Sequence, residues 1–300
     1  MAKKSPAAAT TQYGPQYGLD DNFKKSARLH QSMYRASTLG LAEYKDYGNR
    51  LSDSDAAKGL NFYNGFGISD AVTARYGNKP AVVSDMLRSE HIPFNLFIPL
   101  TTDLEYAARV FNVFLRGAIR TISSIRIEHA PDPKQRYLDD NTSFDAYVEY
   151  CHVDGSKGGL GIEVKYTERE YPYGVTEKKR MDDPNSGYNT FTGKIGIYGP
   201  AFVPRLKEPR YKQLWRNQLL GEKMVDLGDL SHFTSALFFP SGNSHFVQVC
   251  AEYCAGLSVS TREQKFAPVT YEKYIAAASA LASSDSMRAW VEYLEKRYIV

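Results

Sequence analysis

Cysteine and tryptophan are scarce in this sequence of 300 residues, which contains three cysteines and two tryptophans. An odd and sparse set of cysteines argues against a disulfide framework and is typical of a reducing cytoplasm. Long hydrophobic runs are also missing, because no stretch of about eighteen apolar residues occurs. We therefore expect a cytoplasmic protein that does not interact with a membrane.

Two common catalytic motifs are missing as well. The sequence has no Gly-x-x-x-x-Gly-Lys phosphate loop and no Gly-x-Ser-x-Gly elbow, so neither ATP use nor Ser-His-Asp hydrolysis is expected. Cys250 and Cys254 follow His245 closely, but no second ligand pair at zinc-finger spacing exists and the segment is largely apolar. This pattern favours buried thiols over a metal site. Among the other histidines, His152 is expected to be exposed, and His232 has no partner at a useful spacing.

An excess of charge of one sign is also absent. The formal net charge of +3 neither indicates nor excludes nucleic-acid binding. Hydrophobic residues make up 43% and charged residues 24% of the chain, as in ordinary globular proteins. Tyrosine, by contrast, is abundant with 22 residues. These rings would either stack on bases or fill a core, and composition does not distinguish the two.

The order of expected elements indicates an α/β (α+β) fold with a mixed central sheet, flanked by helices and extended by helices at both ends. Residues 1–20 lack an apolar segment and are expected to be a disordered lead-in, followed by a single domain over 21–300. Hydrophobic patterns predict helices over 102–119, 210–227 and 270–298, strands over 121–130, 143–151, 159–167 and 233–241, and a long irregular stretch over 168–208.

The segment 143–168, SFDAYVEYCHVDGSKGGLGIEVKYTE, places charged residues in two otherwise apolar strands. The pair Asp154–Gly155 predicts a hairpin turn between the strands. Alternation along a strand puts Glu163 and Lys165 on one face, and the hairpin register brings Asp145 beside them. Two carboxylates and an ammonium group are therefore expected to converge.

Two neighbouring carboxylates repel each other unless a positive charge lies between them. Mg²⁺ suits this position because it prefers carboxylate oxygens and keeps several waters. A metal held in this way can bind a phosphate oxygen, while a nearby lysine orients water or stabilises developing charge. The residues therefore favour phosphodiester hydrolysis.

Asp145 followed by Glu163-Val164-Lys165 resembles the signature of the PD-(D/E)XK nuclease superfamily, which has the restriction-endonuclease-like fold. The order helix, three-stranded meander, helix and strand is similar to the core of that superfamily, and the resemblance covers about residues 85–250. The phrases GIEVKYTE and YKQLWRNQLL are similar to a bacterial branch of it. One departure is that Phe144, rather than proline, precedes Asp145.

The resemblance implies that Asp145 and Glu163 ligate Mg²⁺ or Mn²⁺, with the carbonyl group of Val164 as a further ligand. It implies that Lys165 positions or activates the attacking water. The activity implied is cleavage of DNA, in bacterial defence or DNA processing.

An acid from the preceding helical region often completes such a site, and both Glu90 and Glu105 qualify. Of the two, Glu90 is the expected ligand. Gln213 resembles a glutamine that some branches place beside the site, and Glu168 would support it from outside.

Basic residues crowd the stretches 177–181 and 205–216, just after the expected site. They form either a solvated charged surface or a phosphate-binding groove. The expected nucleic-acid contacts are Lys178, Lys179, Arg180, Arg210 and Arg216. The expected partner is DNA, with a second copy of the chain or another protein if the system has several components. The alternatives are a non-catalytic DNA-binding module on the same fold and an unrelated α/β interaction protein.

Overall fold

The computed structural model describes residues 10–300 except 78, 171, 259 and 261. The chain divides into two compact units. The first consists of residues up to Thr102 together with Ala282–Val300, and the second of Asp103–Leu281. The prediction of a single domain over 21–300 stays a prediction, because this division says which residues pack together and not which fold together.

The second unit is built on a five-stranded sheet with the order β3-β4-β5-β6-β7. The strands β3, β4 and β5 form an antiparallel meander, and β6 and β7 continue it in parallel. The predicted mixed sheet is therefore confirmed. The strands are β3 (Ile119–His129), β4 (Phe144–His152), β5 (Lys157–Val164), β6 (His232–Phe239) and β7 (Phe266–Thr270).

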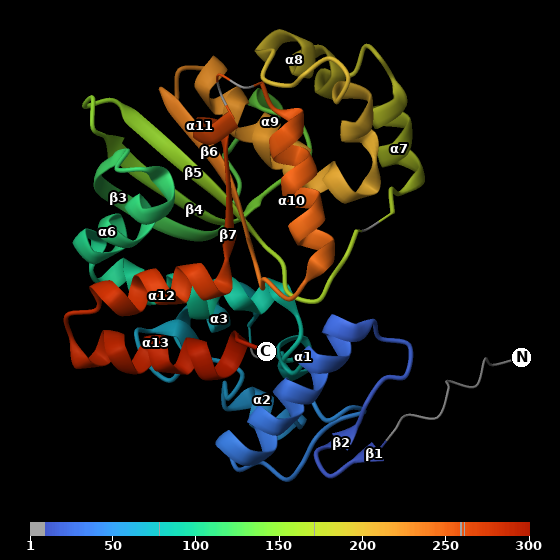
Figure 1. Ribbon diagram of the computed structural model, residues 1–300, viewed down its shortest axis with the longest axis vertical. Coiled ribbons are helices and arrows are strands. Elements are labelled where there is room, and N and C mark those ends of the chain that lie inside the picture. The colour runs from blue at the N-terminus through green and yellow to red at the C-terminus, as the bar shows by residue number, and fades with distance from the viewer. Residues whose placement is uncertain (1–9, 78, 171, 259, 261) are drawn as a thin grey trace, which may run out of the picture. The chain divides into compact units, whose positions relative to one another are not determined.

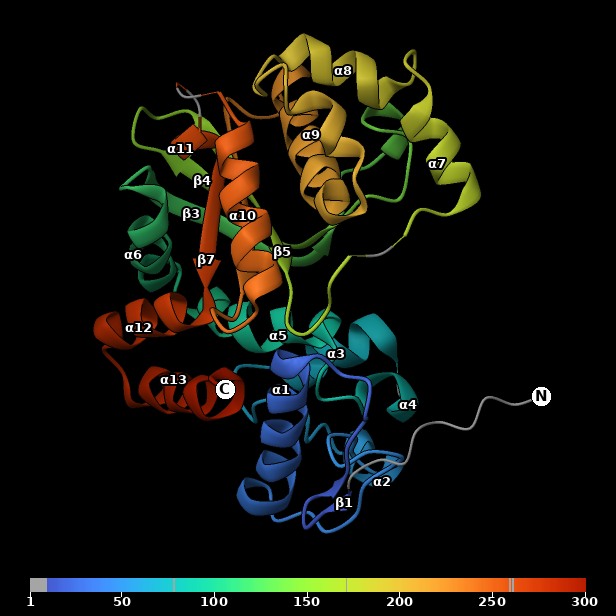
Figure 2. The same cartoon turned by 45° about the vertical axis from the view of Figure 1, so that its right-hand side comes forward.

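Helices cover both faces of this sheet (Figures 1 and 2). The α-helices of the unit are α6 (Leu104–Leu115), α7 (Val175–Asp182), α8 (Gly187–Ile195), α9 (Lys212–Asp226), α10 (Ser244–Gly256), α11 (Arg262–Lys265) and α12 (Tyr271–Leu281). Leu237 of β6 belongs to a buried cluster with residues of α8, α9 and α10. The next residue, Phe238, points to the other face, where it meets Phe114 of α6 and Tyr274 of α12. The two faces thus carry different helices, as alternation along a strand requires.

The strongly patterned elements lie where the sequence predicts them. Helix α6 begins after Asp103, whose side chain accepts a hydrogen bond from the Tyr106 amide at 2.8 Å, as expected of an N-cap. Helix α9 corresponds to the helix predicted over 210–227. The long stretch 168–208, by contrast, is not irregular throughout, since it contains α7, α8 and the short 3₁₀ helix Val203–Lys207. Strand β7 was not predicted, and its Pro268 is tolerated because β7 lies at an edge of the sheet.

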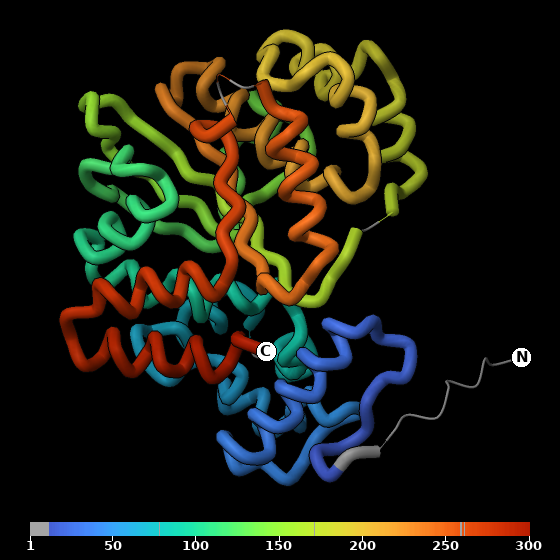
Figure 3. The backbone as a smooth tube through the Cα atoms, viewed as in Figure 1, coloured from blue at the N-terminus to red at the C-terminus, as the bar shows by residue number. Residues whose placement is uncertain are grey.

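The first unit is mainly helical and joins distant parts of the chain. Its C-terminal helix packs with the N-terminal part, which the colours in Figure 3 make visible. For example, the indole of Trp290 donates a hydrogen bond to the carbonyl of Asn95 at 2.7 Å. The α-helices of this unit are α1 (Asn22–Met33), α2 (Asp53–Ala57), α3 (Ile68–Tyr76), α4 (Pro80–Val83), α5 (Ile92–Phe97) and α13 (Asp285–Tyr298).

The N-terminal segment is only partly described. Residues 1–9 of the segment predicted to be disordered lie outside the described residues. In the remainder, β1 (Thr10–Thr11) pairs with β2 (Gly14–Pro15) in a short antiparallel hairpin. None of the helices in the described part of the chain is long and apolar enough to cross a membrane.

Candidate active site

Asp145 and Glu163 lie side by side at one end of the β4–β5 hairpin. The register pairs Ala146 with Ile162, and one further step in the same register brings Asp145 opposite Glu163. The carboxylate of Asp145 also reaches across, because its Oδ2 accepts a hydrogen bond from the Val164 amide at 2.7 Å. The cross-strand register predicted from the turn is therefore the one that the structure has.

Lys165 completes this group. Its ammonium Nζ lies 2.6 Å from Oε1 of Glu163, and both side chains are nearly buried, with 6% and 5% exposed. The backbone at this point is fixed on two sides. The Lys165 amide donates to the carbonyl of Phe238 on β6 at 2.8 Å, and the Lys165 carbonyl accepts from the Tyr271 hydroxyl at 2.7 Å. The lysine is therefore held at the carboxylate by the sheet and not by a mobile loop.

The second oxygen of Glu163 is held by helix α9. Asn217 donates from Nδ2 to Oε2 of Glu163 at 2.7 Å, and both residues are buried. Glu163 is thus fixed between an ammonium group and an amide. The predicted Gln213 lies on the same helix four residues earlier, which is one turn away on the same face. The amide that the structure places against Glu163 is that of Asn217.

Two further acids lie near the group. Glu168, predicted as an outer support, accepts a hydrogen bond from the Tyr166 amide at 2.9 Å, and its charge raises the pKa of Lys165. Glu128 lies opposite Asp145 on β3, between the paired positions Ile127 and His129, and its charge raises the pKa of Asp145. Glu128 has a positive φ of 53°, which is unusual for a residue with a side chain. No local sequence pattern indicates Glu128 or Asn217, because the position of each depends on strand register or on helix placement.

Burial and mutual repulsion of Asp145 and Glu163 dominate the electrostatics of the group. Burial raises the pKa of Asp145 well above its usual range, and the neighbouring Glu163 charge raises it further, against the lowering effect of Lys165. Burial alone would lower the pKa of Lys165, but the carboxylates of Glu163 and Asp145 outweigh it and raise that pKa. The lysine is therefore firmly charged near neutral pH, while the ionised form of Asp145 is unfavourable without a further positive charge.

These residues fit a hard divalent cation. Two carboxylates on adjacent strands offer the oxygen ligands that Mg²⁺ and Mn²⁺ prefer. A cation between them would also relieve the repulsion that raises the pKa of Asp145. The carbonyl oxygen of Val164 stays the further ligand that was predicted.

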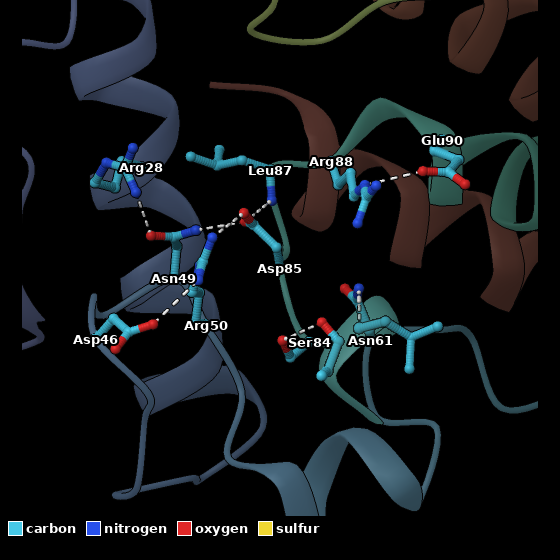
Figure 4. A network of polar contacts seen from close by, with 12 residues as sticks. Arg28, Asp46, Asn49, Arg50, Asn61, Ser84, Asp85, Leu87, Arg88 and Glu90 are labelled. Atoms are coloured by element: carbon cyan, nitrogen blue, oxygen red, sulfur yellow. Dashed lines mark hydrogen bonds and ion pairs between the residues drawn. The ribbon is translucent and has the colours of Figure 1, made fainter. Parts of the chain in front are cut away.

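Glu90 lies in the first unit, on the 3₁₀ helix Ser89–His91. Figure 4 shows its carboxylate beside Arg88, with an Nε–Oε2 distance of 2.9 Å, next to the hydrogen-bonded group around Asp85. Glu105, the other candidate, lies in the first turn of α6 in the second unit. A role for either residue in completing the site stays a prediction.

The side chains predicted to contact nucleic acid differ in how many ion pairs and hydrogen bonds they form with the rest of the protein. Arg210 pairs with Glu208 and Glu252, and Arg216 pairs with Asp140 and Glu177.

The remaining three predicted contacts lie on α7. Arg180 donates to the carbonyls of Leu138 and Asp139. Lys178 and Lys179 are exposed, and Lys178 pairs with Asp182 on the same helix.

The cysteine and histidine segment that was considered for a metal does not gather around one. Cys250 is buried in the core, where burial raises the pKa of its thiol. His245 instead lies 3.1 Å from Oε2 of Glu170. The prediction of a buried thiol holds for Cys250, while Cys254 is only partly buried.

A family model described as the PD-(D/E)XK nuclease superfamily matches residues 18–300. Comparison with curated proteins and with solved structures gives no match. The match covers nearly the whole chain, and the mixed sheet flanked by helices is consistent with the restriction-endonuclease-like α/β fold. The chain belongs to the PD-(D/E)XK nuclease superfamily.

Proposed function

We propose that this protein is a metal-dependent nuclease that hydrolyses phosphodiester bonds in DNA, with Asp145 and Glu163 as the ligands of Mg²⁺ or Mn²⁺. The observation that carries the proposal is the group formed at the end of the hairpin. There, two carboxylates lie on adjacent strands and a buried ammonium group lies 2.6 Å from one of them. The wider role that we propose is bacterial defence or DNA processing.

The structure favours one of the two roles considered for Lys165. Its raised pKa keeps the side chain protonated near neutral pH, so it is a donor and not a general base. We therefore propose that Nζ orients the attacking water and stabilises the negative charge that develops on the phosphate. Asn217 and Lys165 hold Glu163 from both sides, which fixes the direction of its carboxylate. A bound divalent cation supplies Lewis-acid polarisation of a phosphate oxygen.

Helix α7 supports a DNA-binding surface beside this site. Glu177 of α7 pairs with Lys212 and Arg216 of α9, the same helix that carries Asn217. These two ion pairs hold α7 against α9. The exposed residues Lys178 and Lys179 of α7 therefore have a fixed position relative to the helix that contacts Glu163. We propose that Lys178 and Lys179 are the principal phosphate contacts, with Arg180, Arg210 and Arg216 contributing next to them.

Cleavage of DNA tests the catalytic proposal directly. Purified protein is incubated with supercoiled, linear and single-stranded DNA, with Mg²⁺, with Mn²⁺ and with EDTA. Lys165→Ala should reduce cleavage by about a hundredfold or more, without rescue by any metal. Glu163→Gln should also abolish cleavage, but excess Mn²⁺ should partly restore it because its defect is metal affinity. Lys165→Arg should fail as well, since the guanidinium differs in reach and donor geometry.

Lys157 provides a matched control at the other end of β5, where its side chain is 52% exposed and pairs with Glu149. Lys157→Ala removes the same charge from the same strand and should leave cleavage unchanged. Thermal unfolding of each variant separates lost chemistry from lost structure. If the wild-type protein binds DNA but fails to cut it with every divalent metal tested, and the Lys165→Ala and Glu163→Gln variants behave in the same way, the protein is a DNA-binding module instead.

Salt dependence tests the proposed DNA contacts. Each phosphate contact that is lost lowers the slope of log affinity against log salt by about one. The double variant Lys178→Ala, Lys179→Ala should therefore lower the slope by about two. Lys296→Ala is the matched control, because Lys296 forms an exposed i,i+4 pair with Glu292 as Lys178 does with Asp182. An unchanged slope in the double variant would refute the contacts on α7.

A further inference from the structure

A second group of metal-binding side chains lies at the far end of the sheet from Glu163. His152 ends β4, Asp154 lies in the following turn, and His232 begins β6. One ligand atom from each of them lies within 4.8 Å of the others. In β5, five positions separate Gly158, the partner of His232, from Glu163, which corresponds to about 17 Å along the strand. This group is therefore distinct from the candidate active site.

The strand register explains why these histidines meet. Gly158 of β5 pairs with Tyr150 on one side and with His232 on the other, so all three positions share a face. His152 follows Tyr150 by two residues and returns to the same face. The ring of Tyr150 lies over Gly158, where a Cβ would come within 2.3 Å of it, and the two imidazole rings stack with centroids 4.0 Å apart and planes 25° apart.

The carboxylate of Asp154 faces both rings. Its Oδ1 lies 3.0 Å from Nδ1 of His152, and its Oδ2 lies 2.8 Å from Nε2 of His232. Ser156 fixes this orientation, because its amide and its hydroxyl donate to Oδ1 at 2.8 and 2.6 Å. Hydrogen bonds from Ser156, and then from His232, hold the pKa of Asp154 well below its usual range, so the carboxylate is ionised. Support of this kind around a ligand is typical of metal sites.

The ring of His152 faces two groups of Asp154. Its Nδ1 lies 3.3 Å from the Asp154 amide and 3.0 Å from Oδ1 of the carboxylate. In the protonated form Nδ1 donates to Oδ1, and in the deprotonated form both atoms can bind one metal cation. Two imidazoles and a carboxylate together are a donor set that a transition metal uses.

We propose that His152, Asp154 and His232 bind a divalent transition-metal ion of the Zn²⁺ class. Imidazole nitrogen suits zinc and not Mg²⁺, which prefers oxygen. Ligand atoms of a tetrahedral zinc ion lie roughly 3.3 Å apart, for zinc–ligand distances of about 2.0–2.1 Å. The two histidine nitrogens lie 3.0 and 2.8 Å from different oxygens of Asp154, and one ligand atom from each residue lies within 4.8 Å of the others, so the side chains close around a bound ion by turning.

A cavity next to His152 and His232 leaves room for a fourth ligand of the ion. A cavity of about 470 Å³ is lined by His152 and His232 together with Tyr150, Ser231 and Thr234. Water can therefore complete a tetrahedral coordination. The ion would join the β4–β5 turn to the first residue of β6, two segments that are far apart in the sequence, and would stabilise the folded sheet by binding it preferentially.

Zinc binding is measured on the full chain by isothermal titration calorimetry in excess Mg²⁺, with Co²⁺ absorption as a report on tetrahedral geometry. We expect one Zn²⁺ per chain and a rise in the unfolding temperature. His152→Ala and His232→Ala should each weaken binding at least about a hundredfold, and Ser156→Ala, which only orients Asp154, by about 10–100-fold.

Two controls isolate the site. His245→Ala removes a histidine that pairs with Glu170, away from this group, and should leave zinc binding intact. Glu163→Gln should also leave it intact, so the result does not depend on the nuclease proposal. Zinc affinity that is unchanged in folded His152→Ala and His232→Ala proteins would overturn the inference, as would a wild-type chain that binds no Zn²⁺ at micromolar concentration.

Discussion

Asp145 and Asp154 lie at opposite ends of the same β4–β5 hairpin and respond to their surroundings in opposite ways. Burial and the Glu163 charge raise the pKa of Asp145 well above its usual range. Hydrogen bonds from Ser156, and then from the histidines, hold the pKa of Asp154 well below it. One residue type in one hairpin thus gives a carboxylate that is costly to ionise and another that is easy to ionise.

The difference shows what each end of the hairpin lacks. At Asp145, negative charges outnumber the one buried ammonium group of Lys165, so the folded chain has a place for a further cation. At Asp154, donors already surround the carboxylate, and the imidazoles beside it offer nitrogen ligands. We infer that the first end suits a hard cation and the second a transition metal, and the following predictions test that contrast.

The largest expected effect is that substitution at each end of the hairpin abolishes stabilisation by one metal and leaves stabilisation by the other. Asp145→Asn should lower DNA cleavage by about a hundredfold or more and abolish the stabilisation by Mg²⁺, while stabilisation by Zn²⁺ persists. Asp154→Asn should abolish the stabilisation by Zn²⁺, while stabilisation by Mg²⁺ persists. The measurement is the unfolding temperature of each variant with each metal, and cleavage assays accompany it. Loss of both metals in either variant would mean that the two ends are not independent.

The next effect concerns the amide at the active end. Asn217→Ala removes the donor to Oε2 of Glu163, which leaves that carboxylate held on one side only. We expect a loss of about 10–100-fold in Mg²⁺ affinity, as for other groups that orient metal ligands. Gln213→Ala, one turn earlier on α9, is the comparison that tests the predicted glutamine. An equal or larger loss for Gln213→Ala would return the supporting role to Gln213.

Local patterns were sufficient to predict much of this fold. The Asp154–Gly155 turn and the alternation along two strands predict the register that brings Asp145 opposite Glu163, because a two-residue period leaves one register that buries the apolar face. The apolar stripe and Asp103 cap predict α6 for a similar reason. Helices α7 and α8 were missed because both are short and lie in a stretch rich in proline and glycine, and neither shows a strong apolar stripe.

The parts of the sites that were not predicted depend on parallel pairing and helix placement. His152 and His232 come together only because β6 pairs in parallel with β5, so two histidines far apart in sequence share a face. His152 was expected to be exposed and His232 to lack a partner; the His152 ring is 20% exposed, and both rings face Asp154. Asn217 meets Glu163 through the packing of α9 on the sheet, and no short-range pattern encodes that contact.

The smallest expected effect is the pH dependence of folding without metal. The folded-state pKa of Asp145 lies above the ordinary carboxyl value of 3.8, so the folded chain binds more protons in the window between those two values. Stability therefore falls as pH rises through that window. The folded-state pKa of Asp154 lies below 3.8, so its contribution is present above 3.8 and is lost as pH falls through the folded-state value.

Urea unfolding in EDTA, followed from pH 3 to pH 8, would separate these two carboxylates. Asp145→Asn should raise the stability of the metal-free protein at pH 7 and flatten its decline above pH 3.8, because the amide keeps an acceptor for the Val164 amide without the buried charge. Asp154→Asn should lower stability at pH 7 and should reduce the loss of stability that occurs as the pH falls below 3.8. The Asp145 effect should be the larger of the two, because Asp154 is half exposed. Mg²⁺ should remove the advantage of Asp145→Asn, because it stabilises only the wild-type protein. If the Asp145→Asn protein is less stable than the wild type in EDTA, repulsion between carboxylates does not destabilise this end of the hairpin.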